Sequence, residues 1–167
     1  MQECIDWHDS GIKYFYSFLI LNYYKFTKQS YSLLWLALEK LLKIYLILLG
    51  KTTWKELKPT YGHKLNEMFG DSKLDEKKFP IISVICKSMN YNEIRYDYEL
   101  IGNLPQYQIE DIDSEIKNLS EIIVKTINKN FNVNYNNNRK NIILNPKTKR
   151  IVNKSIKTIP NLRMDIT

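Results

Sequence analysis

The sequence predicts an all-α fold: a helical bundle over residues 1–131, followed by a basic extension over residues 132–167. Three observations lead to this prediction. A leucine-rich stretch from Ser30 to Gly50 has no interior glycine or proline and ends at a glycine, a common stop signal of helices. Further stretches carry apolar residues at helical spacing. Finally, charge is balanced up to residue 131 and strongly positive after it.

The stretch from Ser30 to Gly50 is expected to be the central helix, around which the others pack. On a helical wheel at about 100° per residue, Glu39, Lys40 and Lys43 fall in one wedge, and nearly every other side chain is apolar. A membrane span is the competing interpretation, because the stretch is long enough to cross a bilayer. Three central charges would cost about 2.5 to 3.5 kcal/mol each in that position. The sequence therefore favours a buried bundle helix and no membrane contact.

The first helix is expected from about Asp9 to Phe26, with Asp9 or Ser10 as its N-cap. Its apolar stripe consists of Ile12, Phe15, Tyr16, Leu19, Tyr23 and Phe26. Only residues 27–29 separate this helix from the central one. So short a connection implies that the two helices run antiparallel.

Three further helices are expected downstream. A short one covers residues 62–69 and ends at Gly70, and another begins near Pro80, the favoured first-turn position of proline. A strand is the alternative after Pro80, because β-branched residues are frequent there. The last helix runs from Asp111 or Asp113 to about residue 130 and has an aspartate at its start in either register. Residues 90–106 have no regular pattern.

The excess positive charge of the chain lies in the extension. Residues 1–131 contain 17 basic and 17 acidic residues, whereas residues 132–167 contain 8 basic residues and one acidic residue. The extension begins with an asparagine-rich linker, and its apolar segments 142–144 and 150–152 are compatible with a short β-hairpin. Such a basic appendage can contact phosphates, and the alternative is a solvated, asparagine-rich extension, which is the commoner role of such segments. The predicted nucleic-acid contacts in it are Lys147, Lys149, Arg150, Lys154 and Lys157.

Neither a metal nor a cofactor is predicted. Cys4 and Cys86 lie far apart and form no CxxC unit, which argues against a disulfide framework. Cys4 and His8 could share a helical face, and His63 with Cys86 would complete four zinc ligands, but a second closely spaced pair is missing. The first residues are acidic and lack the basic and apolar regions of a secretory signal, so a cytoplasmic location is expected.

Two motifs follow one another in the central part of the chain. Residues 37–43 read Ala-Leu-Glu-Lys-Leu-Leu-Lys and are followed by Gly50, and residues 62–65 read Gly-His-Lys-Leu. Together they resemble the HEPN family (higher eukaryotes and prokaryotes nucleotide-binding domains). In that family the second helix reads Ala-x-Glu-Lys-x-Leu-Lys before a small residue and a His-x-Leu turn. Ile94, Arg95 and Tyr96 are similar to the family's Arg-Tyr element, and the resemblance covers about residues 9–131.

This resemblance implies an antiparallel bundle of four to five helices that commonly forms a homodimer. HEPN proteins often accompany nucleotidyltransferases, and many act in toxin-antitoxin or antiviral-defence systems as RNA-binding or RNA-cleaving modules. The nuclease members carry an arginine followed four to six residues later by a histidine. They cleave without metal, by attack of a ribose 2′-hydroxyl, which needs a proton acceptor and a cation. Here no histidine follows Arg95, and the chain's only histidines are His8 and His63.

The sequence therefore favours a HEPN-like module that binds RNA, a nucleotide or a nucleotidyltransferase partner without cleaving RNA. One alternative is a metal-independent ribonuclease with an atypical site that uses Arg95, Tyr96 or His63. Another is a structural or viral accessory protein whose bundle is a dimerisation core. The candidates also have structural interpretations: a cap or hydrogen-bonding role for His63, an ion pair rather than a phosphate contact for Arg95, and packing for Tyr96.

A mixed apolar and charged strip on the central helix is the predicted subunit interface. It consists of Leu36, Glu39, Lys40, Lys43 and Ile47. Such a strip on an otherwise buried helix suits the contact between two subunits. The competing interpretation is that Glu39 and Lys43 form an i, i+4 ion pair within one chain.

Overall fold

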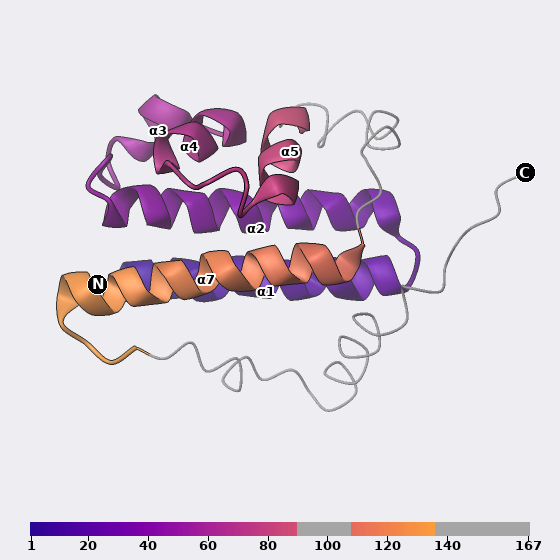
Figure 1. Cartoon of the computed structure of the whole chain (residues 1–167), viewed down its shortest axis with the longest axis horizontal. Coiled ribbons are helices and arrows are strands. Elements are labelled where there is room, and N and C mark those ends of the chain that lie inside the picture. The colour runs from indigo at the N-terminus through magenta and orange to yellow at the C-terminus, as the bar shows by residue number, and fades with distance from the viewer. Residues whose placement is uncertain (90–107, 136–167) are drawn as a thin grey trace, which may run out of the picture.

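The computed structural model describes residues 1–89 and 108–135, which form helices and connecting turns without a strand. Three long helices, α1 (Gln2–Tyr23), α2 (Thr27–Leu48) and α7 (Ile109–Phe131), contact one another (Figure 1). Three short helices, α3 (Leu57–Tyr61), α4 (Leu65–Ser72) and α5 (Pro80–Ser88), lie on the side of α2 away from α1 (Figure 1). The predicted all-α bundle is confirmed for these residues, while the predicted β-hairpin lies outside them.

α2 is the centre of the bundle, because α1, α4 and α7 all pack against it. Its fully covered side chains include Leu34, Trp35, Leu38, Leu41, Leu42, Ile44 and Leu46. The predicted stop at Gly50 is confirmed: the backbone there takes a φ of +68°, which glycine adopts without steric cost. The side-chain amide of Asn130 in α7 donates to the Leu48 carbonyl at 2.7 Å. This bond pairs one of the carbonyls that the end of a helix leaves open. No helix in the described ranges has the length and hydropathy needed to cross a bilayer.

The predicted start of the first helix is wrong. α1 begins at Gln2 instead of near Asp9, and neither Asp9 nor Ser10 caps it. The buried face of the helix extends toward the N-terminus through Cys4 and His8. Because Cys4 belongs to the hydrophobic core and His8 hydrogen-bonds to residues of another segment, these first turns are part of the packed helix.

Two glycines have roles that differ from the predicted ones. Gly62 ends α3 with a φ of +53° rather than starting the short helix, and Gly70 lies inside α4 rather than ending it. The start of the last helix also differs. α7 begins after Gln108, so its acidic residues occupy the first turns instead of the N-cap, where the helix dipole still favours them. The start of α5 at Pro80 is as predicted.

Gly11 allows α1 and α2 to approach closely. A Cβ atom at this position would lie 3.1 Å from Cγ and Cδ2 of Leu41 and 3.5 Å from the carbonyl oxygen of Ala37. Leu41 and Ala37 are both fully buried in α2. Any side chain at Gly11 must therefore displace atoms of a densely packed core.

Gly11→Val is expected to destabilise the bundle by about 1 to 3 kcal/mol, because its methyl groups overfill the contact between α1 and α2. Gly70→Ala is the matched control: this helical glycine is exposed, and no atom lies within 4 Å of an added Cβ. The control is expected to stabilise the protein by about 0.5 to 1 kcal/mol through helix propensity. Urea unfolding followed by circular dichroism measures both changes. Free-energy changes of the same sign would contradict the close packing at Gly11.

A residue from another helix caps the start of α5. The buried carboxylate of Glu115 in α7 accepts the backbone N–H of Ile81 at 3.0 Å and that of Ile82 at 2.8 Å, one on each oxygen. These charge-assisted bonds satisfy two of the N–H groups that a helix start leaves open. Burial raises the pKa of Glu115, and the two backbone donors oppose this shift. The cap joins α5 to α7.

Candidate functional site

The first polar cluster of interest consists of Glu39, Lys43 and His63. Glu39 Oε1 accepts a hydrogen bond from Lys43 Nζ at 2.5 Å and another from His63 Nδ1 at 2.9 Å. Glu39 and Lys43 are buried, whereas the side chain of His63 is 49% exposed. The Trp35 ring of α2 lies beside the imidazole, with 5.8 Å between the ring centroids. The predicted i, i+4 ion pair is therefore present, and His63 is its third member.

The positions of these side chains follow from the local backbone. Glu39 and Lys43 are one turn apart on α2, and the left-handed φ of Gly62 turns the chain back after α3, just before His63. His63 is not a helix cap: α4 begins after Lys64, without a side-chain capping bond. Of the two structural roles predicted for His63, hydrogen bonding is the one observed.

The Glu39–His63 pair has the geometry of an oriented base. A carboxylate bound to Nδ1 holds the imidazole proton on that nitrogen, so that Nε2 is the proton acceptor of the neutral ring. Cleavage of RNA also needs a cation that neutralises the charge developing on phosphorus. The cation of this cluster is Lys43, whose ammonium is already paired with Glu39.

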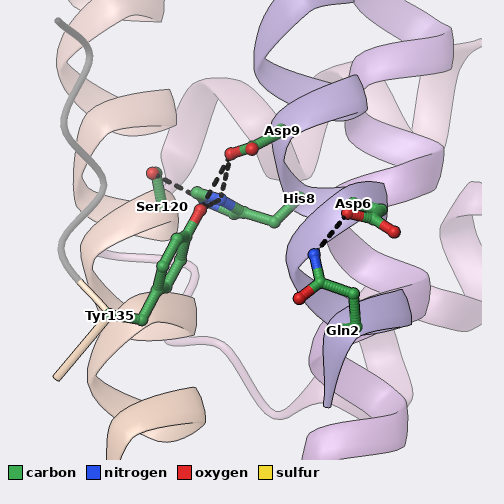
Figure 2. Close-up of polar contacts among 6 residues, drawn as sticks. All are labelled: Gln2, Asp6, His8, Asp9, Ser120 and Tyr135. Carbon is green, nitrogen blue, oxygen red and sulfur yellow. Dashed lines mark hydrogen bonds and ion pairs between the residues drawn. The ribbon is translucent and has the colours of Figure 1, made fainter. Parts of the chain in front are cut away.

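The second polar cluster joins α1 to α7 through His8 (Figure 2). Ser120 Oγ lies 2.9 Å from His8 Nε2, and the Tyr135 hydroxyl lies 3.1 Å from His8 Nδ1 and donates to Asp9 Oδ1 at 2.8 Å. Because Tyr135 gives its only proton to Asp9, its oxygen accepts from Nδ1–H. Nε2 of the neutral ring then accepts from Ser120. All three hydrogen bonds run in the same direction, toward the Asp9 carboxylate, and can strengthen one another.

The electrostatics of this second cluster fit a structural role. The His8 imidazole, 3.8 Å from Asp9 Oδ1, lowers the pKa of Asp9, and the Tyr135 hydroxyl lowers it further. Burial raises the pKa of Tyr135, and so does its hydrogen bond to Asp9. His8 and Ser120 are buried. The cluster contains a serine, a histidine and an aspartate, but its serine and histidine are closed off from solvent.

Tyr135 reaches His8 because the chain folds back after α7. Asn132 takes the left-handed conformation that ends the helix, with a φ of 49°. The side-chain amide of Asn128 then pairs with the backbone of Tyr135: its Nδ2 donates to the carbonyl at 2.8 Å, and its Oδ1 accepts from the N–H at 2.7 Å. The packed part of the chain thus continues to residue 135, past the domain boundary predicted at residue 131.

The residues of the predicted interface divide into two groups. Glu39 and Lys43 are buried within the chain, in the first cluster. Leu36, Lys40 and Ile47 stay partly exposed along α2. Only the second group is therefore available to a partner without rearrangement of the bundle.

An aromatic cluster surrounds Lys40. Its Nζ lies 4.2 Å from the ring centroid of Trp7 and 5.8 Å from that of Tyr14, which are favourable distances for a cation over an aromatic ring. The rings of Trp7 and Trp54 meet edge to face with their centroids 5.0 Å apart. Burial lowers the pKa of Lys40. The cluster brings together residues of α1, α2 and the segment before α3, which no local pattern connects.

The other candidate residues lie outside the described parts of the chain. They are Arg95, Tyr96, Lys147, Lys149, Arg150, Lys154 and Lys157. Within residues 1–89 and 108–135, no group of three or more His, Cys, Asp or Glu side chains is arranged to hold a metal ion. Cys4 and Cys86 are buried free thiols, and burial raises the pKa of each.

Comparisons with known proteins identify no relative: no family model, no curated protein and no solved structure matches the chain. The HEPN assignment thus rests on the two sequence motifs and stays a prediction. The structure adds one observation about them. Glu39 and Lys43 of the first motif and His63 of the second belong to the same hydrogen-bonded cluster.

Proposed function

We propose that this chain is a HEPN-like binding module that engages RNA without cleaving it. The observation that carries the proposal is the cluster in which Glu39, Lys43 and His63, from the two HEPN-like motifs, meet. With a neutral imidazole this cluster has no net charge, because the Lys43 ammonium and the Glu39 carboxylate cancel each other. His8 is buried and offers no accessible base. The basic extension supplies the phosphate contacts instead.

The proposal includes a homodimer. Its contact surface is the partly exposed strip of Leu36, Lys40 and Ile47, together with Trp7 and Trp54 beside Lys40. Aromatic residues are enriched at protein interfaces, which supports this choice of surface. A nucleotide or a nucleotidyltransferase partner in place of RNA, and a role in a toxin-antitoxin or antiviral-defence system, follow from the HEPN resemblance.

A metal-independent ribonuclease is the second candidate function. The observation in its favour is the Glu39–His63 pair, which orients a half-exposed imidazole as a proton acceptor. In this function a second cation, such as Arg95, has to complete the site.

Incubation of the full chain with labelled single-stranded RNA in EDTA distinguishes the two functions. We expect the RNA to be bound and to stay intact, and we expect His63→Gln to leave its affinity within about twofold of the original, since His63 does not touch RNA in the proposed function. RNA cleavage in EDTA that is lost in His63→Gln or in Arg95→Ala would establish the ribonuclease. Absence of both binding and cleavage would contradict both functions.

A further inference from the structure

We propose that the tip of the α1–α2 hairpin is a stacking platform for unpaired RNA bases, formed by Tyr23, Tyr24, Lys25 and Phe26. This inference rests on the proposed RNA binding and adds a contact site to it. The tip lies at the end of the bundle opposite the C-terminal end of α7, after which the basic extension begins (Figure 1).

The tip exposes two aromatic rings. Tyr24 is 51% exposed and Phe26 is 54% exposed. Tyr23 packs edge to face against Tyr24, with 5.2 Å between the centroids and an interplanar angle of 80°, and so supports that ring. Phe26 was expected to complete the buried stripe of the first helix, and this prediction is wrong. Because α1 ends at Tyr23, the Phe26 ring lies outside the core, where a ligand can reach it.

The turn between the two rings is well defined. The N–H of Phe26 bonds to the Leu21 carbonyl and the N–H of Lys25 bonds to the Asn22 carbonyl, both at 3.0 Å, in the Schellman pattern of helix ends. Lys25 occupies the left-handed position of this motif, with a φ of 64°. Glycine is the usual residue there, because a side chain is sterically unfavourable in this conformation. Lys25 is instead an exposed, positively charged residue that stands in the sequence between the two exposed aromatic residues.

The part of the α1–α2 hairpin that flanks the tip contains no acidic residue, because none occurs between Asp9 and Glu39. Exposed rings beside a cation match single-stranded RNA, whose bases stack on aromatic side chains and whose phosphates attract ammonium groups. The first turn of α7, at the same end of the bundle, carries Glu110 and Asp111 (Figure 1). We therefore expect the RNA single strand to approach the tip from the side of α1 and α2, away from these two acidic residues. Duplex RNA hides its base faces and lacks this mode of contact.

The first test measures binding of the full chain to a fluorescent uridine-rich single strand by anisotropy. The double variant Tyr24→Ala, Phe26→Ala is expected to weaken binding by about tenfold or more, since stacked bases depend strongly on their aromatic partners. Its salt dependence should not change, because stacking neutralises no phosphate. Leu49→Ala with Phe131→Ala is the matched control, since both side chains are 39% exposed and lie outside the tip. This control is expected to bind like the original chain.

A pair of glycine variants separates stability from binding. Lys25 and Lys73 both take left-handed backbone conformations after a helix, so Lys25→Gly and Lys73→Gly should both raise the midpoint of thermal unfolding. Only Lys25→Gly is expected to weaken RNA binding, by about threefold, and to lower the salt slope by about 0.7, the contribution of one phosphate on a single strand. A purely structural role of Lys25 would give the gain in stability without the loss of affinity.

The outcomes separate this inference from the proposed function. RNA binding by the original chain that is unchanged in all tip variants would overturn the inference and leave the proposed function in place. Absence of RNA binding by the original chain would overturn both. If the tip variants bind RNA normally and instead lose binding to vesicles of phosphatidylglycerol, the platform contacts an anionic membrane and the inference is wrong.

Discussion

Removal of residues 136–167 is expected to flatten the salt dependence of RNA binding while the bundle stays folded. The deletion removes all eight basic residues of the extension and leaves Tyr135 in place. If the five predicted contacts each neutralise one phosphate, the slope of log K against log salt becomes shallower by about 3.5, at about 0.7 per phosphate on a single strand. Anisotropy titrations at several salt concentrations measure the slope. An unchanged slope would make the extension a solvated, asparagine-rich segment without a role in binding.

A second truncation, after residue 131, is the control for folding. It removes the same basic residues, so its salt slope should equal that of the first truncation. It also removes Tyr135, which leaves His8 Nδ1 without its acceptor and Asp9 without a donor. The loss of these bonds is expected to lower the free energy of unfolding by about 1 to 3 kcal/mol relative to the first truncation. Equal stability of the two shortened chains would contradict a structural role for Tyr135.

The long helices could be predicted because their burial patterns are local. In α2, apolar residues surround a narrow charged wedge, and the stop at Gly50 is set by a backbone conformation that glycine favours. The Glu39–Lys43 pair could likewise be predicted, because residues four apart on a helix face each other. The membership of His63 in this cluster depends on the turn at Gly62, which sequence spacing suggests only through the resemblance to a family.

The remaining features depend on contacts between distant segments. His8 and Tyr135 are 127 positions apart, and the asparagine-rich composition after residue 131 resembles a linker although Tyr135 is packed. Gly62 and Gly70 are the same residue type, but one ends a helix and the other lies within one. Lys25 and Lys73 adopt left-handed conformations without glycine's usual signal. In each case the surrounding fold, rather than the local sequence, selects the conformation.

Glu115→Ala is expected to lower the free energy of unfolding, because it removes the acceptors of two backbone N–H groups at the start of α5. Leaving a buried donor unpaired costs about 1 to 3 kcal/mol, and the Ile81 donor is only partly buried, so a total of about 2 to 4 kcal/mol is expected. For a chain of this size, each kcal/mol lowers the midpoint of thermal unfolding by about 2 to 4 °C. Calorimetry measures that midpoint directly.

Two further variants show whether the effect arises from the cap. Glu121→Ala removes an exposed carboxylate from the same helix and should change the stability by about 0.5 kcal/mol or less. Glu115→Gln keeps the shape but has only one acceptor oxygen for the Ile81 and Ile82 donors, so it should lose part of the stability that Glu115→Ala loses. Hydrogen exchange at these two amides is expected to accelerate in both Glu115 variants. If Glu115→Ala is no more destabilising than Glu121→Ala, α5 is held to α7 by its apolar face rather than by the carboxylate.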